Sequence, residues 1–119
     1  MANIMITDDA MFMRKMLSSI LTSDGHTIIA EASNGAEAIE KYKQCKPDLV
    51  TMDITMPDVD GIEALKGIMS LDPSAKVIMC TAMGQQALVV EAIKNGAKDF
   101  MVKPFEADNI CNAVNKALQ

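Results

Sequence analysis

The sequence predicts an α/β fold built from five β/α units around a parallel sheet. Two observations support this prediction: short apolar runs alternate with segments of helical period, and turn residues stand where one pattern changes to the other. Strict alternation of strands and helices gives right-handed crossovers, which place helices on both faces of a parallel sheet. The 119 residues, 50% of them apolar, suit one domain with its own buried core.

Five apolar runs are too short for helices and are rich in Ile, Val and Met, so we expect strands that are buried on both faces. These runs span residues 4–7, 27–30, 49–52, 77–80 and 100–102. Five strands in an open, doubly wound sheet favour the flavodoxin-like order 2-1-3-4-5. In that order the chain reverses direction between strands 1 and 3, and ligands bind at the carboxyl ends of the strands beside that point.

Apolar residues at helical spacing separate these runs, and each set marks the buried face of one helix. In chain order the sets are Met13, Met16, Leu17, Ile20 and Leu21; Ala38, Tyr42 and Cys45; Ile62, Leu65 and Met69; Ala87, Val90 and Ile93; and Ala107, Ile110, Cys111, Val114, Ala117 and Leu118. Turn sequences fall between the elements, at Asp24-Gly25, Lys46-Pro47-Asp48, Asp58-Val59-Asp60-Gly61 and Asp72-Pro73-Ser74. The fourth helix ends at Asn95-Gly96, where glycine suits a left-handed residue.

The composition argues against several classes of protein. A net charge of −5 without a basic stripe disfavours nucleic-acid binding, and no apolar run approaches the ~18 residues of a membrane span. Cys45, Cys80 and Cys111 have no metal-ligand spacing, so we interpret them as buried or half-buried residues in a reducing compartment. We therefore expect a cytoplasmic monomer that acts through a protein partner, without nucleic acid or membrane.

Acidic residues follow two strands that are neighbours in the predicted order. Asp8 and Asp9 follow the first strand and Asp53 follows the third, so three carboxylates should converge on one crevice. Carboxylates in close quarters repel unless a cation neutralises them, and oxygen ligands at an open site suit Mg²⁺. The alternative is three solvated loop aspartates, with Asp9 as the N-cap of a helix. Their joint position favours the metal site.

The fourth and fifth strands end in Thr81 and Lys103 at the same edge of the sheet. A carboxylate, a hydroxyl and an ammonium group around one metal ion are the parts needed for phosphoryl transfer. Asp53 would be the nucleophile that forms an aspartyl phosphate. Mg²⁺ and Lys103 would neutralise the phosphoryl oxygens, and Thr81 would donate a hydrogen bond to one of them.

These motifs together resemble the response-regulator receiver domain family, and the resemblance covers residues 1–119 as one domain. The matching pieces are Asp8-Asp9, Met52-Asp53-Ile54-Thr55-Met56-Pro57, Gly61, Thr81-Ala82 and Lys103-Pro104-Phe105. The resemblance implies a signalling protein that receives phosphate on Asp53 from a histidine kinase. It implies further that the protein promotes only its own phosphorylation and dephosphorylation and is not otherwise an enzyme. It also implies that Asp9 binds Mg²⁺ directly, Asp8 mostly through water and Thr55 through its backbone carbonyl, and that the Lys103-Pro104 bond is cis.

Within that family the chain resembles the single-domain chemotaxis regulators, through residues 82–86 and its length. The resemblance implies the histidine kinase CheA as the phosphodonor and the flagellar motor switch protein FliM as the partner, and it leaves room for a phosphatase. The alternative is a stand-alone phosphorelay receiver that passes its phosphate to a histidine phosphotransfer protein. Binding to a FliM peptide or to a phosphotransfer domain would distinguish the two.

Phosphorylation is expected to change the surface formed by the fourth helix, the fifth strand and the fifth helix. Phe100 would fill the space that Thr81 leaves, as an aromatic switch without the hydroxyl that tyrosine would offer a partner. We predict that Val89 is partly exposed and joins Phe100 in the partner surface; the alternative is that both are core residues. Thr55 and Met83 flank the pocket at positions that influence dephosphorylation in the family.

Two enzyme classes share features with this pattern. A flavodoxin has the same fold, but its first loop must hold a phosphate, which Asp8 and Asp9 would repel. A haloacid-dehalogenase-like phosphatase needs a second Asp two residues after its nucleophile, on the first strand, whereas Thr55 stands there after the third strand. Both classes are disfavoured.

Overall fold

A computed structural model describes residues 2–56 and 59–119. The strands are β1 (Asn3–Thr7), β2 (Thr27–Ala32), β3 (Leu49–Asp53), β4 (Val77–Thr81) and β5 (Asp99–Val102). The helices are α1 (Met11–Ser23), α2 (Gly35–Cys45), α3 (Gly61–Leu71), α4 (Gln86–Lys94) and α5 (Ala107–Leu118). Pro57 of the predicted motif and Asp58 of the predicted turn lie outside the described residues.

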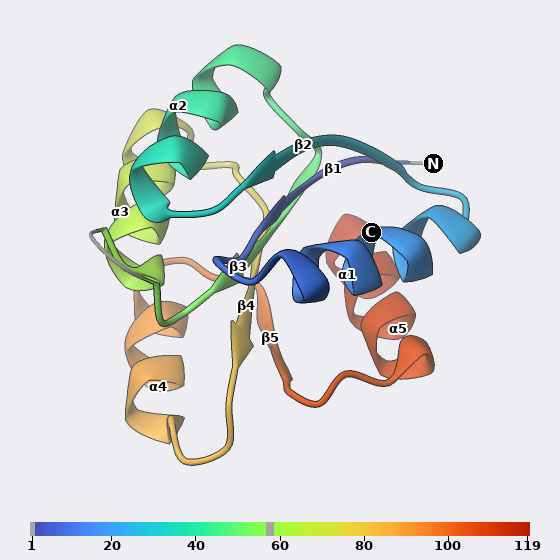
Figure 1. The fold of residues 1–119 in the computed structure, drawn as a ribbon. Helices are drawn as coiled ribbons and strands as arrows, with labels where there is room; N and C mark the ends of the chain where they lie inside the picture. Colours follow the sequence, from blue (N-terminus) through green and yellow to red (C-terminus); the bar gives the residue numbers. More distant parts are fainter. Residues whose placement is uncertain (1, 57–58) are drawn as a thin grey trace.

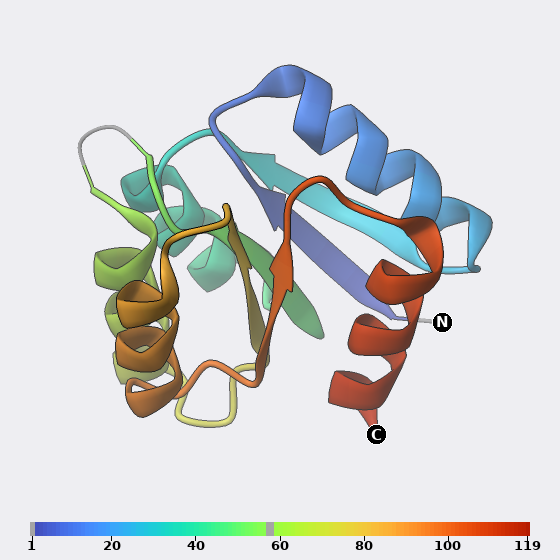
Figure 2. The same ribbon diagram turned by 90° about the horizontal axis from the view of Figure 1, so that it is seen from below.

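The five strands form one parallel sheet in the order β2-β1-β3-β4-β5, which confirms the predicted topology. Helices α2, α3 and α4 cover one face of the sheet, and α1 and α5 cover the other (Figures 1 and 2). The chain crosses from one face to the other between β1 and β3, so the loops after these strands open onto the same edge.

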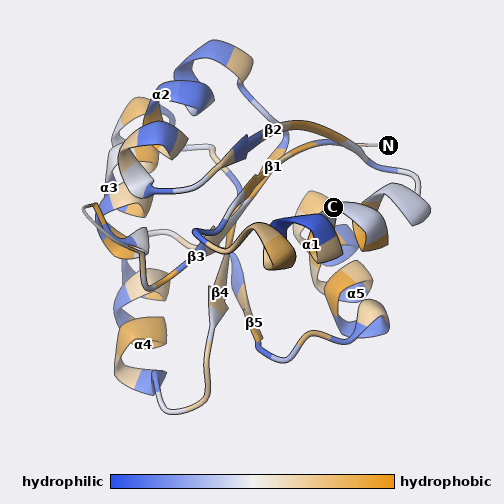
Figure 3. Ribbon diagram, in the orientation of Figure 1, coloured by the Kyte–Doolittle hydropathy of each residue, from blue (hydrophilic) through white to orange (hydrophobic). Residues whose placement is uncertain are grey.

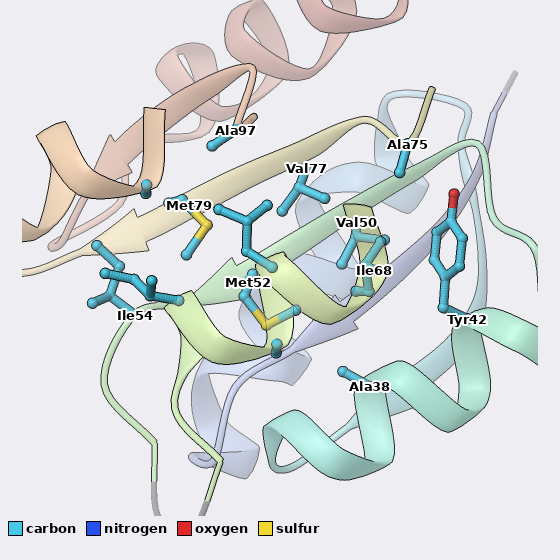
Figure 4. Close-up of a cluster of buried hydrophobic side chains, with 14 of the residues drawn as sticks. Ala38, Tyr42, Val50, Met52, Ile54, Ile68, Ala75, Val77, Met79 and Ala97 are labelled. Atoms are coloured by element: carbon cyan, nitrogen blue, oxygen red, sulfur yellow. The ribbon is translucent and has the colours of Figure 1, made fainter. Parts of the chain in front are cut away.

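Two apolar clusters fill the space between the sheet and its helices. One contains Tyr42, Met52, Leu65 and Met79 and lies under α2, α3 and α4 (Figure 4). The other contains Ile6, Leu17, Ile78, Ile110 and Val114 and lies under α1 and α5. These clusters confirm the buried faces predicted for α1, α3 and α5, except at Ala107, which is exposed at the start of α5.

Local sequence sets where the helices begin and end. The side chains of Asn34 and Asp60 accept hydrogen bonds from the backbone N–H groups of Glu37 and Glu63 and so cap α2 and α3. Gly96 follows α4 with φ +107°, the left-handed conformation predicted for it.

Two of the predicted strands are not buried on both faces. β2 and β5 form the edges of the sheet and keep exposed residues such as Thr27, Phe100 and Val102. The central strands β3 and β4 are buried along their whole length, because they have a neighbour on each side and helices on each face.

The face predicted to be buried on α4 is wrong. Val90 and Ile93 are exposed, whereas Ala92 is buried and Val89 packs against the core. Apolar residues occur around most of this helix (Figure 3), so its period alone does not distinguish the inner face from the outer one.

The prediction for Cys45 is also wrong: its side chain is exposed at the end of α2, whereas Cys80 is buried and Cys111 half-buried. Each helix among the described residues is too short or too polar to cross a bilayer.

Candidate phosphoryl and metal site

Asp8, Asp9 and Asp53 meet at the carboxyl edge of the sheet, as predicted. β1 and β3 are paired neighbours, and this pairing brings their C-terminal ends together although they are far apart in sequence. One carboxylate oxygen from each residue lies within 4.8 Å of the others. Asp8 and Asp53 are buried, whereas Asp9 is exposed, so the acidic pocket opens to solvent on the side of Asp9.

The backbone holds Asp8 in place from both sides. Its N–H donates to the carbonyl of Ala32 at the end of β2 (3.0 Å), and its own carbonyl accepts from Nη1 of Arg14 (2.6 Å). Its Oδ1 atom accepts from the N–H of Ala10 (2.9 Å). The residue before α1 is Ala10, whose side chain makes no capping bond, so the alternative of Asp9 as an N-cap is wrong.

Asp53 is the last residue of β3, and a glycine is needed beside it. The N–H of Gly61 donates to the carbonyl of Ile54 (2.8 Å), which draws the start of α3 against the end of the strand. A Cβ atom at Gly61 would collide with the carbonyl oxygen of Asp53. This close approach explains why the motif contains glycine at this position.

Lys103 reaches the acidic pocket from the loop after β5. Its Nζ lies 3.1 Å from Oδ2 of Asp8 and 3.5 Å from Oδ2 of Asp53. The N–H of Lys103 donates to the carbonyl of Thr81 (2.8 Å), which ties this loop to the end of β4. The Lys103-Pro104 bond is cis, as the resemblance implied.

The charges in the pocket are not balanced. Burial and the charges of Asp8 and Asp9 raise the pKa of Asp53 to about 6, although Lys103 acts in the opposite direction. Burial alone would lower the pKa of Lys103, but Asp53 and Asp8 raise it above its ordinary value. Among the residues that the structure describes, three carboxylates face one ammonium group, so a hard divalent cation beside Asp9 and Asp53 would relieve the repulsion. Oxygen-only ligands and the open side of the pocket fit such an ion.

Thr81 lies at the same edge, but its hydroxyl is already engaged. Its Oγ1 donates to Oε1 of Gln85 (2.6 Å), and the Nε2 of Gln85 donates to Oγ1 of Thr55 (2.9 Å). Gln85 thus bridges two of the predicted site residues. Sequence reasoning missed it, because a glutamine in a loop carries no signal of which polar groups its side chain will reach.

The predicted partner residues line a groove beside the site. The groove has a volume of about 520 Å³, has mostly apolar walls, and runs between α4 and β5. Val89 and Val90 line one wall, and Phe100 and Val102 line the other. Phe100 is 44% exposed, so the alternative that it is a core residue is wrong. Val89 is half-buried, as predicted, since it packs on the core and also lines the groove.

The fold and the site define a class of protein. The profile of the response regulator receiver domain matches residues 4–115 of the sequence. The chain therefore belongs to the response-regulator receiver domain family. Its pocket of three aspartates and one lysine lies at the carboxyl ends of the strands, beside the point where the strand order reverses.

Within this family the chain is similar to proteins named chemotaxis protein CheY. It is 60% identical to that of Thermotoga maritima, over 95% of this chain and 94% of the relative, and 60% identical to that of Bacillus subtilis, over 97% and 96%. Among solved structures it is similar to a complex of CheX with CheY, BeF₃ and Mg²⁺ from Borrelia burgdorferi. That match has a TM-score of 0.94 and 43% identity, and it covers 98% of this chain and 89% of the other.

Proposed function

We propose that residues 1–119 form a single receiver domain of two-component signalling that is phosphorylated on Asp53 by a histidine kinase. The observation that carries this proposal is the meeting of Asp53 with Asp8, Asp9 and Lys103 at one open edge of the sheet. A carboxylate oxygen of Asp53 attacks the phosphorus of a phosphohistidine; the new P–O bond forms as the P–N bond breaks, and the imidazole leaves. With a pKa of about 6, Asp53 is mostly ionised at neutral pH and able to attack.

Mg²⁺ is the cofactor that the pocket suits. Asp9 and Asp53 would bind it directly together with the backbone carbonyl of Thr55, and Asp8 would act through water, because both of its oxygens already accept from protein donors. When bound, the ion supplies positive charge that stabilises the phosphoryl oxygens. Lys103 adds its ammonium charge on the opposite side, and Thr81 donates a hydrogen bond after phosphorylation.

The proposed output is a change in the groove between α4 and β5. A phosphoryl group adds roughly two negative charges beside Thr81, and movement of Thr81 frees space for Phe100 to turn inward. The groove would then take an amphipathic segment of a partner. Since the relatives are named chemotaxis proteins, we propose CheA as the kinase and FliM as the partner. A CheX-like protein is a further candidate partner, because the Borrelia CheY is found in a complex with CheX.

Phosphorylation with a small phosphodonor tests the central part of this proposal. The wild-type protein is incubated with acetyl phosphate and Mg²⁺, and the bound phosphate is measured before and after brief acid and alkali treatment. We expect phosphate that is labile to alkali and absent from Asp53→Ala, with Asp99→Ala as a matched control on β5. If Asp53→Ala still binds alkali-labile phosphate, Asp53 is not the phosphorylated residue and the proposal is contradicted.

Partner binding tests the chemotaxis part separately. Phosphorylated protein is passed over an immobilised FliM peptide and over a histidine phosphotransfer domain. Retention on the peptide, and none for the unphosphorylated protein, is the expected result. Rapid loss of the phosphate to the phosphotransfer domain, without peptide binding, would support a relay instead.

A further inference from the structure

Gln85 connects the two loops that border the acidic pocket. It is the residue immediately before α4, and its side chain lies between the loop after β3 and the loop after β4. Its Oε1 accepts from Oγ1 of Thr81 (2.6 Å) and from the N–H of Ala82 (2.8 Å), and its Nε2 donates to Oγ1 of Thr55 (2.9 Å). The N–H of Ala82 can only donate, so the oxygen of the amide must face it and the orientation of the amide is determined.

This arrangement occupies the only hydrogen of the Thr81 hydroxyl. A hydroxyl has one O–H donor, and Oγ1 of Thr81 lies 2.6 Å from Oε1 of Gln85 and 3.1 Å from the carbonyl of Ala82. The contact with Gln85 is the shorter of the two, so Gln85 is the main acceptor of that hydrogen. A phosphoryl group on Asp53 also requires that hydrogen, because its oxygens are acceptors. Thr81 therefore has to leave Gln85 before it can donate to the phosphoryl group.

We propose that Gln85 is a positioning residue that holds Thr81 in the unphosphorylated arrangement, and that phosphorylation must break this bridge. The inference rests on the proposed function and adds a regulatory residue to it. Gln85 therefore lowers the free energy gained on activation, because Thr81 can donate a hydrogen bond to the phosphoryl group only after it loses its hydrogen bond to Gln85.

The same residue links the pocket to the partner groove. The backbone carbonyl of Gln85 accepts from the N–H groups of Leu88 and Val89, in the first turn of α4. Val89 lines the groove, as does Gln85 itself. Release of the Gln85 side chain would leave these backbone bonds in place but remove the tie between the start of α4 and Thr81 and Thr55. The position of Thr81 is thereby coupled to the residue that begins α4 and lines the groove.

Beryllofluoride, a stable mimic of the phosphoryl group, provides the test. The affinity of beryllofluoride at saturating Mg²⁺ is measured for the wild-type protein and for two variants. Gln85→Met keeps the length of the side chain but removes the amide. Gln86→Met is the matched change at the neighbouring exposed residue. One hydrogen bond typically shifts an equilibrium about fivefold, so Gln85→Met should bind beryllofluoride about fivefold more tightly. Gln86→Met should bind as the wild type does.

A second readout observes the variants without metal ion or mimic, and it uses the wild-type beryllofluoride complex only as a reference. In the unphosphorylated protein, the NMR signal of the Thr81 methyl group should move in Gln85→Met toward its position in the beryllofluoride complex. Gln85→Glu keeps an acceptor oxygen for Thr81 and should leave that signal near its wild-type position. Thr55→Val removes only the bond that Nε2 of Gln85 donates, and it should tighten beryllofluoride binding by a smaller factor. Because this variant leaves Gln85 in place, it tests the bridge even if the Gln85 variants fold poorly.

The outcomes separate the two proposals. Wild-type protein that does not bind beryllofluoride would overturn the proposed function itself. Wild-type binding together with equal or weaker binding by Gln85→Met would overturn the role of Gln85 alone; weaker binding would mean that the amide contacts the phosphoryl group rather than opposing it.

Discussion

The ammonium group of Lys103 lies 3.1 Å from Oδ2 of Asp8, across 95 residues of sequence. Asp8 is almost completely buried, and Lys103 is its charged partner. This ion pair joins the loop after the edge strand β5 to the end of the interior strand β1, across the carboxyl ends of β3 and β4.

Lys103→Met should destabilise the protein. The substitution leaves the buried Asp8 without its counter-charge, and a buried charge without a partner is costly. Because Lys103 keeps a quarter of its side chain exposed, we expect a moderate loss of about 2 kcal/mol in the free energy of unfolding, measured by urea denaturation at neutral pH. Lys98→Met, at the opposite end of β5, should change stability by less than about 0.5 kcal/mol. Equal stability of the two variants would contradict this account of the ion pair.

Asp53 should make stability depend on pH in metal-free buffer. Its pKa is about 6, above the ordinary 3.8, so between these values the folded protein binds more protons than the unfolded chain. The free energy of unfolding therefore falls as the pH rises through this window; the contribution of Asp53 is complete below pH 3.8 and lost above about 6. Asp53→Asn cannot ionise and should be more stable than the wild type at neutral pH, by up to about 3 kcal/mol.

Denaturation with urea at several pH values, in the presence of a chelator, measures this difference. The advantage of Asp53→Asn should disappear toward the acidic end of the window. Added Mg²⁺ should stabilise the wild type more than the variant, because it neutralises a carboxylate that the variant lacks. A difference that does not vary with pH would contradict the assignment of the raised pKa.

Gly61→Ala should damage the pocket through the backbone. The new Cβ would meet the carbonyl oxygen of Asp53 and the Cα of Ile54, and neither can move without shifting the end of β3. We expect a loss of roughly 2–4 kcal/mol, in the range of overpacked or strained sites, together with slower phosphorylation by acetyl phosphate. Gly67→Ala is the matched control on the same helix, since its Cβ would meet only side-chain atoms of Ile39, Cδ1 and Cγ1, and no backbone atom. A milder effect at position 61 than at position 67 would contradict the argument.

Val90→Lys should weaken partner binding without weakening the fold. Val90 is 54% exposed and lines the groove, so a lysine there costs little stability but places a charge on an apolar surface. We expect at least about a tenfold loss of affinity for a FliM peptide, typical of a central interface residue, and an unchanged rate of phosphorylation. Leu71→Lys, an exposed apolar residue at the end of α3, should leave the affinity unchanged. A similar loss for both variants would indicate nonspecific binding.

Sequence reasoning predicted the fold and the position of the pocket because both depend on local patterns. Alternating runs give the element order, the order gives the sheet, and the sheet brings Asp8 and Asp53 together. The buried face of α4 was predicted wrongly, since Val90 and Val89 are equally apolar and only the neighbouring elements determine which one packs inward. Gln85 could not be predicted either, because its bridge depends on the conformations of two loops and of one long side chain.

Chemical mapping of the phosphorylated residue tests the central claim most directly. After incubation with acetyl phosphate and Mg²⁺, borohydride reduction converts an aspartyl phosphate to homoserine, and mass spectrometry of peptides locates the modified residue. We expect homoserine at position 53, only when Mg²⁺ is present, and none in a parallel sample of Lys103→Met or of Asp9→Ala at the same exposure time. Homoserine at position 8 or 9, or no modification of the wild-type protein, would contradict the account.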